Sequence, residues 1–230
     1  MKKGIKISLI VFGVIALILI GIAIVMTTPK NIGVKYTKAD LISVNSKLGM
    51  TYNSLSYSDG SPQSVKLSGK RQINTQITES ELTALLNQPN SQWKDYPLSH
   101  IQLKINDDGS VEMTGKILTK RLKAYSEATN MPEQYKSIIE EKIDLIPVNP
   151  SFDYKGNYQI KNGKLEGEMT ELKFGPLTVP KDWTDNNKNT ISNFITDRMN
   201  SAGMQVESAT FVGGKLSIKG TIPETIGFEK

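Results

Sequence analysis

The twelve residues Tyr158–Met169, YQIKNGKLEGEM, carry the pattern that decides the fold. Apolar and polar side chains alternate on both sides of Asn162-Gly163, a dipeptide typical of two-residue turns between antiparallel strands. Strict alternation places one set of side chains on a dry face of a sheet and the other set in water. The stretch therefore predicts a β-hairpin with one buried face.

Two further segments repeat this pattern around different turns. Asp107-Asp108-Gly109 separates one pair of alternating runs, and Gly213-Gly214 separates the other. After Met169 the parity of the apolar residues shifts, which predicts a β-bulge near residues 170–171. We therefore expect three antiparallel hairpins in a curved sheet.

Amphipathic helices are predicted around these hairpins. Two of them begin at Thr-x-x-acid-Leu motifs, at Thr37 and Thr78, where the Thr and the acid can cap each other's backbone N–H. Pro89 is expected to end the second of these helices. Apolar residues at helical spacing predict three more helices, over 121–129, 132–146 and 181–200. The predicted fold class is α+β, an antiparallel, curved hairpin sheet packed on amphipathic helices.

The first thirty residues predict a membrane anchor. Ile7–Met26 contains twenty residues without a charge, which as a helix would span about 30 Å, the thickness of a bilayer's hydrocarbon core. A buried core helix and a cleaved signal peptide are the alternatives, but the apolar part of a signal peptide is shorter and ends at small residues. We expect a cytoplasmic tail over 1–4, a transmembrane helix over 5–27, a linker over 28–35 and an extracytoplasmic domain over 36–230.

The distribution of charge supports this topology. Lys2, Lys3 and Lys6 precede the apolar stretch, which favours a cytoplasmic N-terminus and a single-pass protein of the cell membrane. The chain has a net charge of +5, but its first thirty residues hold four lysines and no acid, so the other 200 residues carry only +1. A nearly neutral domain lacks the basic surface that binds phosphate backbones, so we expect no nucleic-acid partner.

Neither a catalytic constellation nor a metal site is visible in the sequence. His100 is the only histidine, no nucleophile motif accompanies it, and the chain has no cysteine. Asp107-Asp108 lies in a predicted turn, where Asp is favoured for backbone reasons. Trp93 and Trp183 lie near predicted helix boundaries, where they could contact a membrane interface or a sugar, or cover the core. We expect no enzyme activity, no cofactor and no metal, while a hydrolase with carboxylates distant in sequence stays open.

Four glycines occupy strand positions where the alternation would place an inward apolar side chain. They are Gly69, Gly115, Gly167 and Gly220. Glycine inside a strand marks a bend or the close approach of another group, so sheet curvature and close helix packing are one interpretation. The other is a thinned inner face that leaves room for an elongated apolar ligand. Under that interpretation these glycines, with Met113 and Ile218, are the candidate ligand-binding residues.

The order of the motifs also carries a resemblance. The anchor and the two helix starts are followed by Asn162-Gly163-Lys164-Leu165 and by Gly175-Pro176-Leu177-Thr178-Val179-Pro180 ahead of a helix. Over about residues 36–223 the chain resembles uncharacterised membrane-anchored envelope proteins of Gram-positive bacteria and, more distantly, the tubular lipid-binding superfamily. This resemblance implies a coiled sheet around a helix, an apolar groove and lipid handling in the cell envelope. The predicted 181–200 helix departs from that superfamily's long apolar helix, because it is rich in Asn, Asp and Lys.

Three classes of function are compatible with these features. A module that binds a lipid or another amphiphile accounts for the inward glycines, the alternating sheet and the anchor together, and it is our prediction. A non-catalytic scaffold or accessory protein for an envelope enzyme or transporter is the alternative, with a protein of the envelope as its partner. An enzyme acting on envelope polymer or lipid is the third. In each case the membrane is a partner through residues 5–27.

Overall fold

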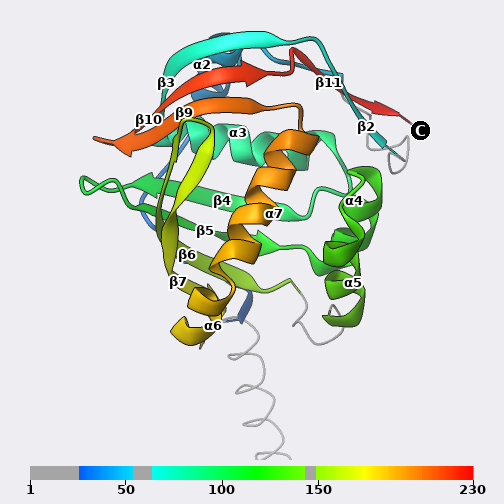
Figure 1. Cartoon of the computed structure of the whole chain (residues 1–230), viewed down its shortest axis with the longest axis vertical. Helices are drawn as coiled ribbons and strands as arrows, with labels where there is room; N and C mark the ends of the chain where they lie inside the picture. Colours follow the sequence, from blue (N-terminus) through cyan, green and yellow to red (C-terminus); the bar gives the residue numbers. More distant parts are fainter. Residues whose placement is uncertain (1–25, 54–63, 143–148, 230) are drawn as a thin grey trace, which may run out of the picture.

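The three predicted hairpins are present in the computed structural model of the chain, which describes residues 26–53, 64–142 and 149–229 (Figure 1). Asn162 and Gly163 both have left-handed φ angles, 51° and 72°, as a tight two-residue turn requires. The hairpins pair β4 (Leu98–Ile105) with β5 (Val111–Ile117), β6 (Ser151–Lys161) with β7 (Lys164–Phe174), and β9 (Gln205–Val212) with β10 (Lys215–Ile222).

One antiparallel sheet joins these hairpins in the order β3-β10-β9-β6-β5-β4, with β3 at Arg71–Thr78. Strand β6 pairs with β5 and β9 along one edge and with β7 along its other edge, and β7 also pairs with the short β8 (Leu177–Thr178). Whereas β5 pairs with residues 151–156 of β6, β9 pairs with β6 only at Ile160. Two groups of strands therefore diverge from one strand, and the sheet is strongly curved (Figure 1).

The predicted bulge is confirmed in β7. Gly156 pairs with Met169 while its neighbour Lys155 pairs with Glu171, so Thr170 is the extra residue. The Thr170 hydroxyl donates a hydrogen bond of 3.1 Å to the Lys155 carbonyl. Such an insertion bends the strand and increases its twist, which adds to the curvature of the sheet.

A second, three-stranded sheet was not predicted from the sequence. Its central strand is β11 (Thr225–Glu229), which pairs in parallel with β1 (Thr51–Asn53) and antiparallel with β2 (Ser64–Ser68). The predicted strand that ends at Gly69 is β2, so it belongs to this sheet and not to a hairpin.

Both Thr-x-x-acid-Leu motifs begin helices, α2 (Lys38–Leu48) and α3 (Glu79–Gln92), and both form complete capping boxes. The expectation that Pro89 ends the second helix is wrong. Helix α3 continues to Gln92, and the N–H of Trp93 donates to the Pro89 carbonyl at 2.8 Å. A proline within a helix costs about 3 kcal/mol, so contacts along α3 must outweigh that cost.

The contacts that hold α3 run along the outer edge of β4. Three α3 side chains accept hydrogen bonds from β4 backbone N–H groups: Glu79 from Ile105 (3.1 Å), Thr83 from Leu103 (3.0 Å) and Asn87 from Ile101 (3.0 Å). Four helical residues rise about 6 Å and two strand residues about 6.6 Å, so the two series stay in register. The helix thereby covers an edge that would otherwise be free to pair with another chain.

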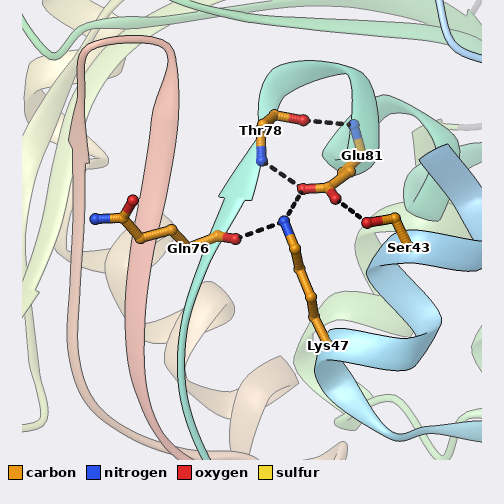
Figure 2. A network of polar contacts seen from close by, with 5 residues as sticks. All are labelled: Ser43, Lys47, Gln76, Thr78 and Glu81. Atoms are coloured by element: carbon orange, nitrogen blue, oxygen red, sulfur yellow. Dashed lines mark hydrogen bonds and ion pairs between the residues drawn. The ribbon is translucent and has the colours of Figure 1, made fainter.

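Figure 2 shows a polar network that joins α2 to the start of α3. The Glu81 carboxylate accepts from Lys47 (2.7 Å), from the Ser43 hydroxyl (2.5 Å) and from the Thr78 N–H (2.8 Å). Lys47 also donates to the Gln76 carbonyl of β3 at 2.9 Å. Burial alone would raise the pKa of Glu81, but these hydrogen bonds outweigh it and hold that pKa below its ordinary value. The network is a structural clamp between three elements.

The remaining helices follow the prediction with one correction. The predicted helix over 181–200 is two helices, because the chain turns at Asn187. The predicted helix over 132–146 is helical from Glu133 to Lys142, and its last four residues lie outside the described part of the chain. The elements are η2 (Thr119–Arg121), α4 (Leu122–Ala128), α5 (Glu133–Lys142), α6 (Lys181–Asn186) and α7 (Lys188–Ser201). Helix α7 crosses diagonally in front of β4, β5 and β6 (Figure 1).

The predicted tail over 1–4 lies outside the described residues, as does the predicted anchor over 5–27 except for Met26 and Thr27. Within the described ranges, no helix has both the length and the apolar character needed to cross a membrane.

Candidate functional site

An apolar cavity of about 410 Å³ lies between α7 and the concave face of the main sheet. Strands β4 to β7, β9 and β10 form its floor, with Met113, Phe211 and Ile218 among the floor residues. The described side chains that line it are apolar apart from Gln159 and the hydroxyls of Tyr154 and Tyr158. Its volume falls within the range of about 300–1,000 Å³ that is typical of small-molecule sites.

Helix α7 provides the roof of the cavity. Ile191, Ile195 and Met199 recur at four-residue spacing, so they lie on one helix face, and all three line the cavity. Yet no residue of α7 is fully buried. An apolar helix face that spans a hydrophobic sheet without closing on it leaves space for another apolar group.

Two tyrosines that line the cavity, Tyr154 and Tyr158, have a glycine between them on β6, and the position of the Tyr154 ring depends on that glycine. Tyr154, Gly156 and Tyr158 share one face of β6, because side chains alternate along a strand. A Cβ placed on Gly156 would lie 2.9 Å from the Tyr154 ring carbon that bears the hydroxyl and 2.8 Å from the Glu168 carbonyl oxygen. Without a side chain at Gly156, the Tyr154 ring can lie along the strand.

Both tyrosines are held in the neutral phenol form. Burial raises the pKa of Tyr154 far above its ordinary value, and the neighbouring Tyr158 adds to that rise. Burial also raises the pKa of Tyr158, and the nearby charge of Glu168 raises it further. Neutral phenols supply hydrogen-bonding groups to an apolar space without adding charge.

A groove of about 800 Å³ with many polar side chains adjoins the apolar cavity. Met199, Met204 and Val206 line both spaces, so the two are neighbours across these side chains. The groove is otherwise mostly polar, with side chains from the β6–β7 turn, from α7 and from β9 and β10; they include Lys161, Asn162, Thr196, Asn200, Glu207 and Lys219. Together the two spaces present an almost entirely apolar cavity beside a groove of mixed lining that holds many polar side chains.

Residues of α4, of α5 and of the connection between them hold the roof helix from outside the cavity. Arg198 donates to the Thr129 carbonyl at 3.4 Å and to the Tyr125 hydroxyl at 3.5 Å, and its guanidinium lies 5.8 Å from the Tyr125 ring centre. Phe194 packs edge-on against Tyr135, with the ring centres 4.8 Å apart. The hydrogen bonds of Arg198 are long and no residue of α7 is fully buried, so we expect α7 to be fixed less firmly than the strands beneath it.

The predicted site residues separate into two groups. Met113 and Ile218 line the cavity, whereas the four glycines are not among the lining residues. Gly69 is exposed, with φ 73°, in the connection between β2 and β3 and so not in a strand, and a Cβ on Gly115 would lie 2.9 Å from the Phe152 ring.

Gly167 and Gly220 face neighbouring backbone. A Cβ on Gly167 would lie 2.7 Å from the Tyr158 Cα, and one on Gly220 would lie 2.8 Å from the Val206 Cα. Backbone or ring atoms therefore occupy the space beside Gly115, Gly167 and Gly220, and the Glu224 side chain occupies it beside Gly69. The sequence did not predict Gly156, Tyr154 and Tyr158 as site residues, although Tyr-x-Gly-x-Tyr-x-Ile at residues 154–160 has the same alternation of apolar and polar side chains.

The described residues offer little else for chemistry. No group of three or more His, Cys, Asp or Glu among them could hold a metal ion. His100 is exposed on β4 with a left-handed φ of 54°, at an irregularity of the ladder with β5, and its Nδ1 lies 3.2 Å from the Ser99 hydroxyl.

No protein-family model, curated protein or solved structure matches this chain.

Proposed function

We propose that this chain is a membrane-anchored, extracytoplasmic protein of the cell envelope that binds an amphiphile, with the apolar chain of the ligand in the cavity under α7. The observation that carries the proposal is the nearly complete apolar lining of that cavity next to a groove with many polar side chains. Burial of apolar surface contributes about 25 cal/mol per Å², so an acyl chain gains most of its binding energy there. The groove keeps a polar head group hydrated or hydrogen-bonded.

The size of the cavity supports a narrower statement about the ligand. A volume near 410 Å³ is at the small end of the range for ligand sites. It favours a single-chain amphiphile, or one chain of a larger lipid, over a molecule that buries several chains. The neutral tyrosines at the edge of the cavity are suited to a ligand group that accepts or donates a hydrogen bond.

The test is to express residues 31–230, extract the purified domain and identify bound lipids by mass spectrometry, then titrate it with oleate. Ile195→Trp fills the cavity from its roof and should reduce both the co-purified lipid and the binding of oleate. Asn193→Trp is the matched control, because Asn193 is exposed on the same helix. The proposal is contradicted if the domain carries no amphiphile and if Ile195→Trp and Asn193→Trp bind oleate equally well. The accessory-protein alternative would then replace it.

A further inference from the structure

The point where the predicted anchor meets the domain is visible in the described residues. Met26 is the last residue of the twenty-residue uncharged stretch. The Ser151 hydroxyl donates to its carbonyl oxygen at 3.2 Å, and a Cβ placed on Gly175 would lie 2.9 Å from its Cα. The chain therefore enters the domain beside the start of β6 and the end of β7, at the end of the molecule where α6 also lies (Figure 1).

Two large apolar side chains are exposed close to this entry point. Leu177 of β8 is 61% exposed and Trp183 of α6 is 50% exposed. They follow Gly175 by two and eight residues. Exposed apolar groups gathered at one place indicate an interaction surface, and tryptophan is enriched where membrane and water meet.

The charges around these side chains cancel. Lys173 pairs with Glu171, and Lys181 pairs with Asp185 at 3.0 Å. Over residues 171–188 three lysines are matched by three acids: Lys173, Lys181, Lys188, Glu171, Asp182 and Asp185. A surface without net charge is not attracted by anionic head groups, so apolar contact must provide its affinity.

We propose that the β7–β8 turn and α6 form a membrane-contact surface, with Leu177 and Trp183 inserted into the interfacial region of the bilayer that the predicted anchor crosses. This inference rests on the predicted anchor and concerns a surface outside the amphiphile cavity. Helix α7 begins at Lys188, directly after α6, and Ile191 lines both the cavity and a small space beside Thr184 and Lys188. Contact at α6 therefore brings the Ile191 end of the cavity close to the lipid.

The two tryptophans of the chain make a direct test. The full chain is reconstituted into phosphatidylcholine vesicles with brominated acyl chains, as the single-tryptophan variants Trp93→Phe and Trp183→Phe. Trp183 emission should be blue-shifted and should lose intensity relative to unbrominated vesicles. Trp93, only 5% exposed, serves as the internal control and should be unaffected. Neither 1 M salt nor anionic lipid should change the result, because the surface has no net charge.

A second measurement covers the case in which Trp93→Phe does not fold. The chain has no cysteine, so Leu177→Cys and Val212→Cys can each carry one environment-sensitive fluorophore. Val212 is 68% exposed and is the last residue of β9, and the β9–β10 turn is well separated from α6 in Figure 1. The label at 177 should report an apolar environment and the label at 212 should report water.

Three outcomes overturn the proposal: a chain that does not float with vesicles, equal quenching of both tryptophans, or a label at 177 that reports water. These readouts are independent of the cavity. In a chain that carries the fluorophore at position 177, the cavity-filling substitution Ile195→Trp should leave the fluorophore signal unchanged. A native chain that binds no amphiphile but gives the expected signal at 177 would contradict the proposed function alone.

Discussion

At the scale of single residues, Gly156 sets the position of the Tyr154 ring at the edge of the cavity. Gly156→Ala should push that ring away from the strand, because the new methyl would lie within 2.9 Å of it. Overpacking of this kind costs about 1–3 kcal/mol of unfolding free energy, and we expect weaker oleate binding as well. Denaturant unfolding and oleate titration measure the two effects.

Gly227→Ala is the matched control for that substitution. Gly227 also lies in a strand, β11, but its added Cβ would meet only the Lys66 carbonyl oxygen, at an ordinary 3.7 Å. Its unfolding free energy and oleate affinity should stay close to those of the native chain. If both glycine variants behave alike, Gly156 has no special part in placing Tyr154.

The buried carboxylate of Glu81 predicts a dependence of stability on pH. Its pKa is lowered in the folded protein, so the stabilisation is present above the ordinary glutamate pKa of about 4.3 and is lost as the pH falls through the lower folded value. Glu81→Gln should cost about 1–3 kcal/mol near neutral pH, as for a hydrogen bond to a buried charge. The difference between the native chain and the variant should shrink below about pH 4.

Chemical denaturation of both proteins across pH 3–7 measures this difference. Glu133→Gln is the control, because the Glu133 side chain is 84% exposed and lies 3.7 Å from Lys136. A solvent-exposed pair of this kind contributes little, so the control should follow the native pH profile. A Glu81→Gln deficit that is constant over this pH range would show that the carboxylate charge is not the stabilising feature.

At the scale of elements, the seam between α3 and β4 depends on side chains that bond to backbone. Thr83 is completely buried, and its hydroxyl accepts from the Leu103 N–H and donates to the Leu103 carbonyl. Thr83→Val keeps the shape but leaves both buried backbone groups without that partner, at a cost of about 1–3 kcal/mol. Hydrogen exchange of the Leu103 amide should become faster.

Thr83→Ser retains the hydroxyl and is the control for this seam. It should preserve slow exchange at Leu103, although it loses a buried methyl group and some stability with it. Equally fast exchange in both variants would mean that the hydroxyl does not protect the strand edge. Because β4 is an edge strand of the main sheet, we also expect Thr83→Val to self-associate more readily.

The elements that the sequence predicted well are those whose signals are local. Asn162-Gly163 and Thr78 with Glu81 act over two to four residues, and the hairpin and capping box are both confirmed. Beyond Pro89, Asn90 of α3 accepts a hydrogen bond of 3.0 Å from Arg121, 31 positions away, and the pairing of Thr51 with Thr225 joins residues 174 positions apart. Distant partners such as these leave no pattern in a single sequence.

In the candidate site, too, the features with a local sequence signal were predicted and those that depend on distant residues were not. Alternation identifies which strand residues point inward, and Met113 and Ile218 do line the cavity. It cannot say what fills the space beside an inward glycine, and at Gly115 the occupant is the Phe152 ring. The roof provided by α7 depends on where that helix crosses the sheet, which its own periodicity does not encode.

At the scale of the whole molecule, α7 should open more easily than the sheet unfolds. Arg198 joins it to α4 through the Thr129 carbonyl and Tyr125. Arg198→Ala should speed hydrogen exchange over residues 188–201 and the release of bound oleate, while exchange in β4 stays slow. Asn193→Ala is the control, since Asn193 is exposed on the same helix. Uniform acceleration throughout the chain would instead indicate global destabilisation.

Because β11 lies between β1 and β2, the three-stranded sheet cannot form until residues 225–229 have been synthesised. At about 5–20 residues per second, Thr225 leaves the ribosome roughly 9–35 s after Thr51, its partner in the ladder 174 residues away. Throughout that interval β1 and β2 have no strand between them, and non-local pairing of this kind is slow even once the chain is complete. The small sheet is thus a late step of biogenesis, and until it forms, two unpaired strands are available to chaperones, proteases or a neighbouring nascent chain.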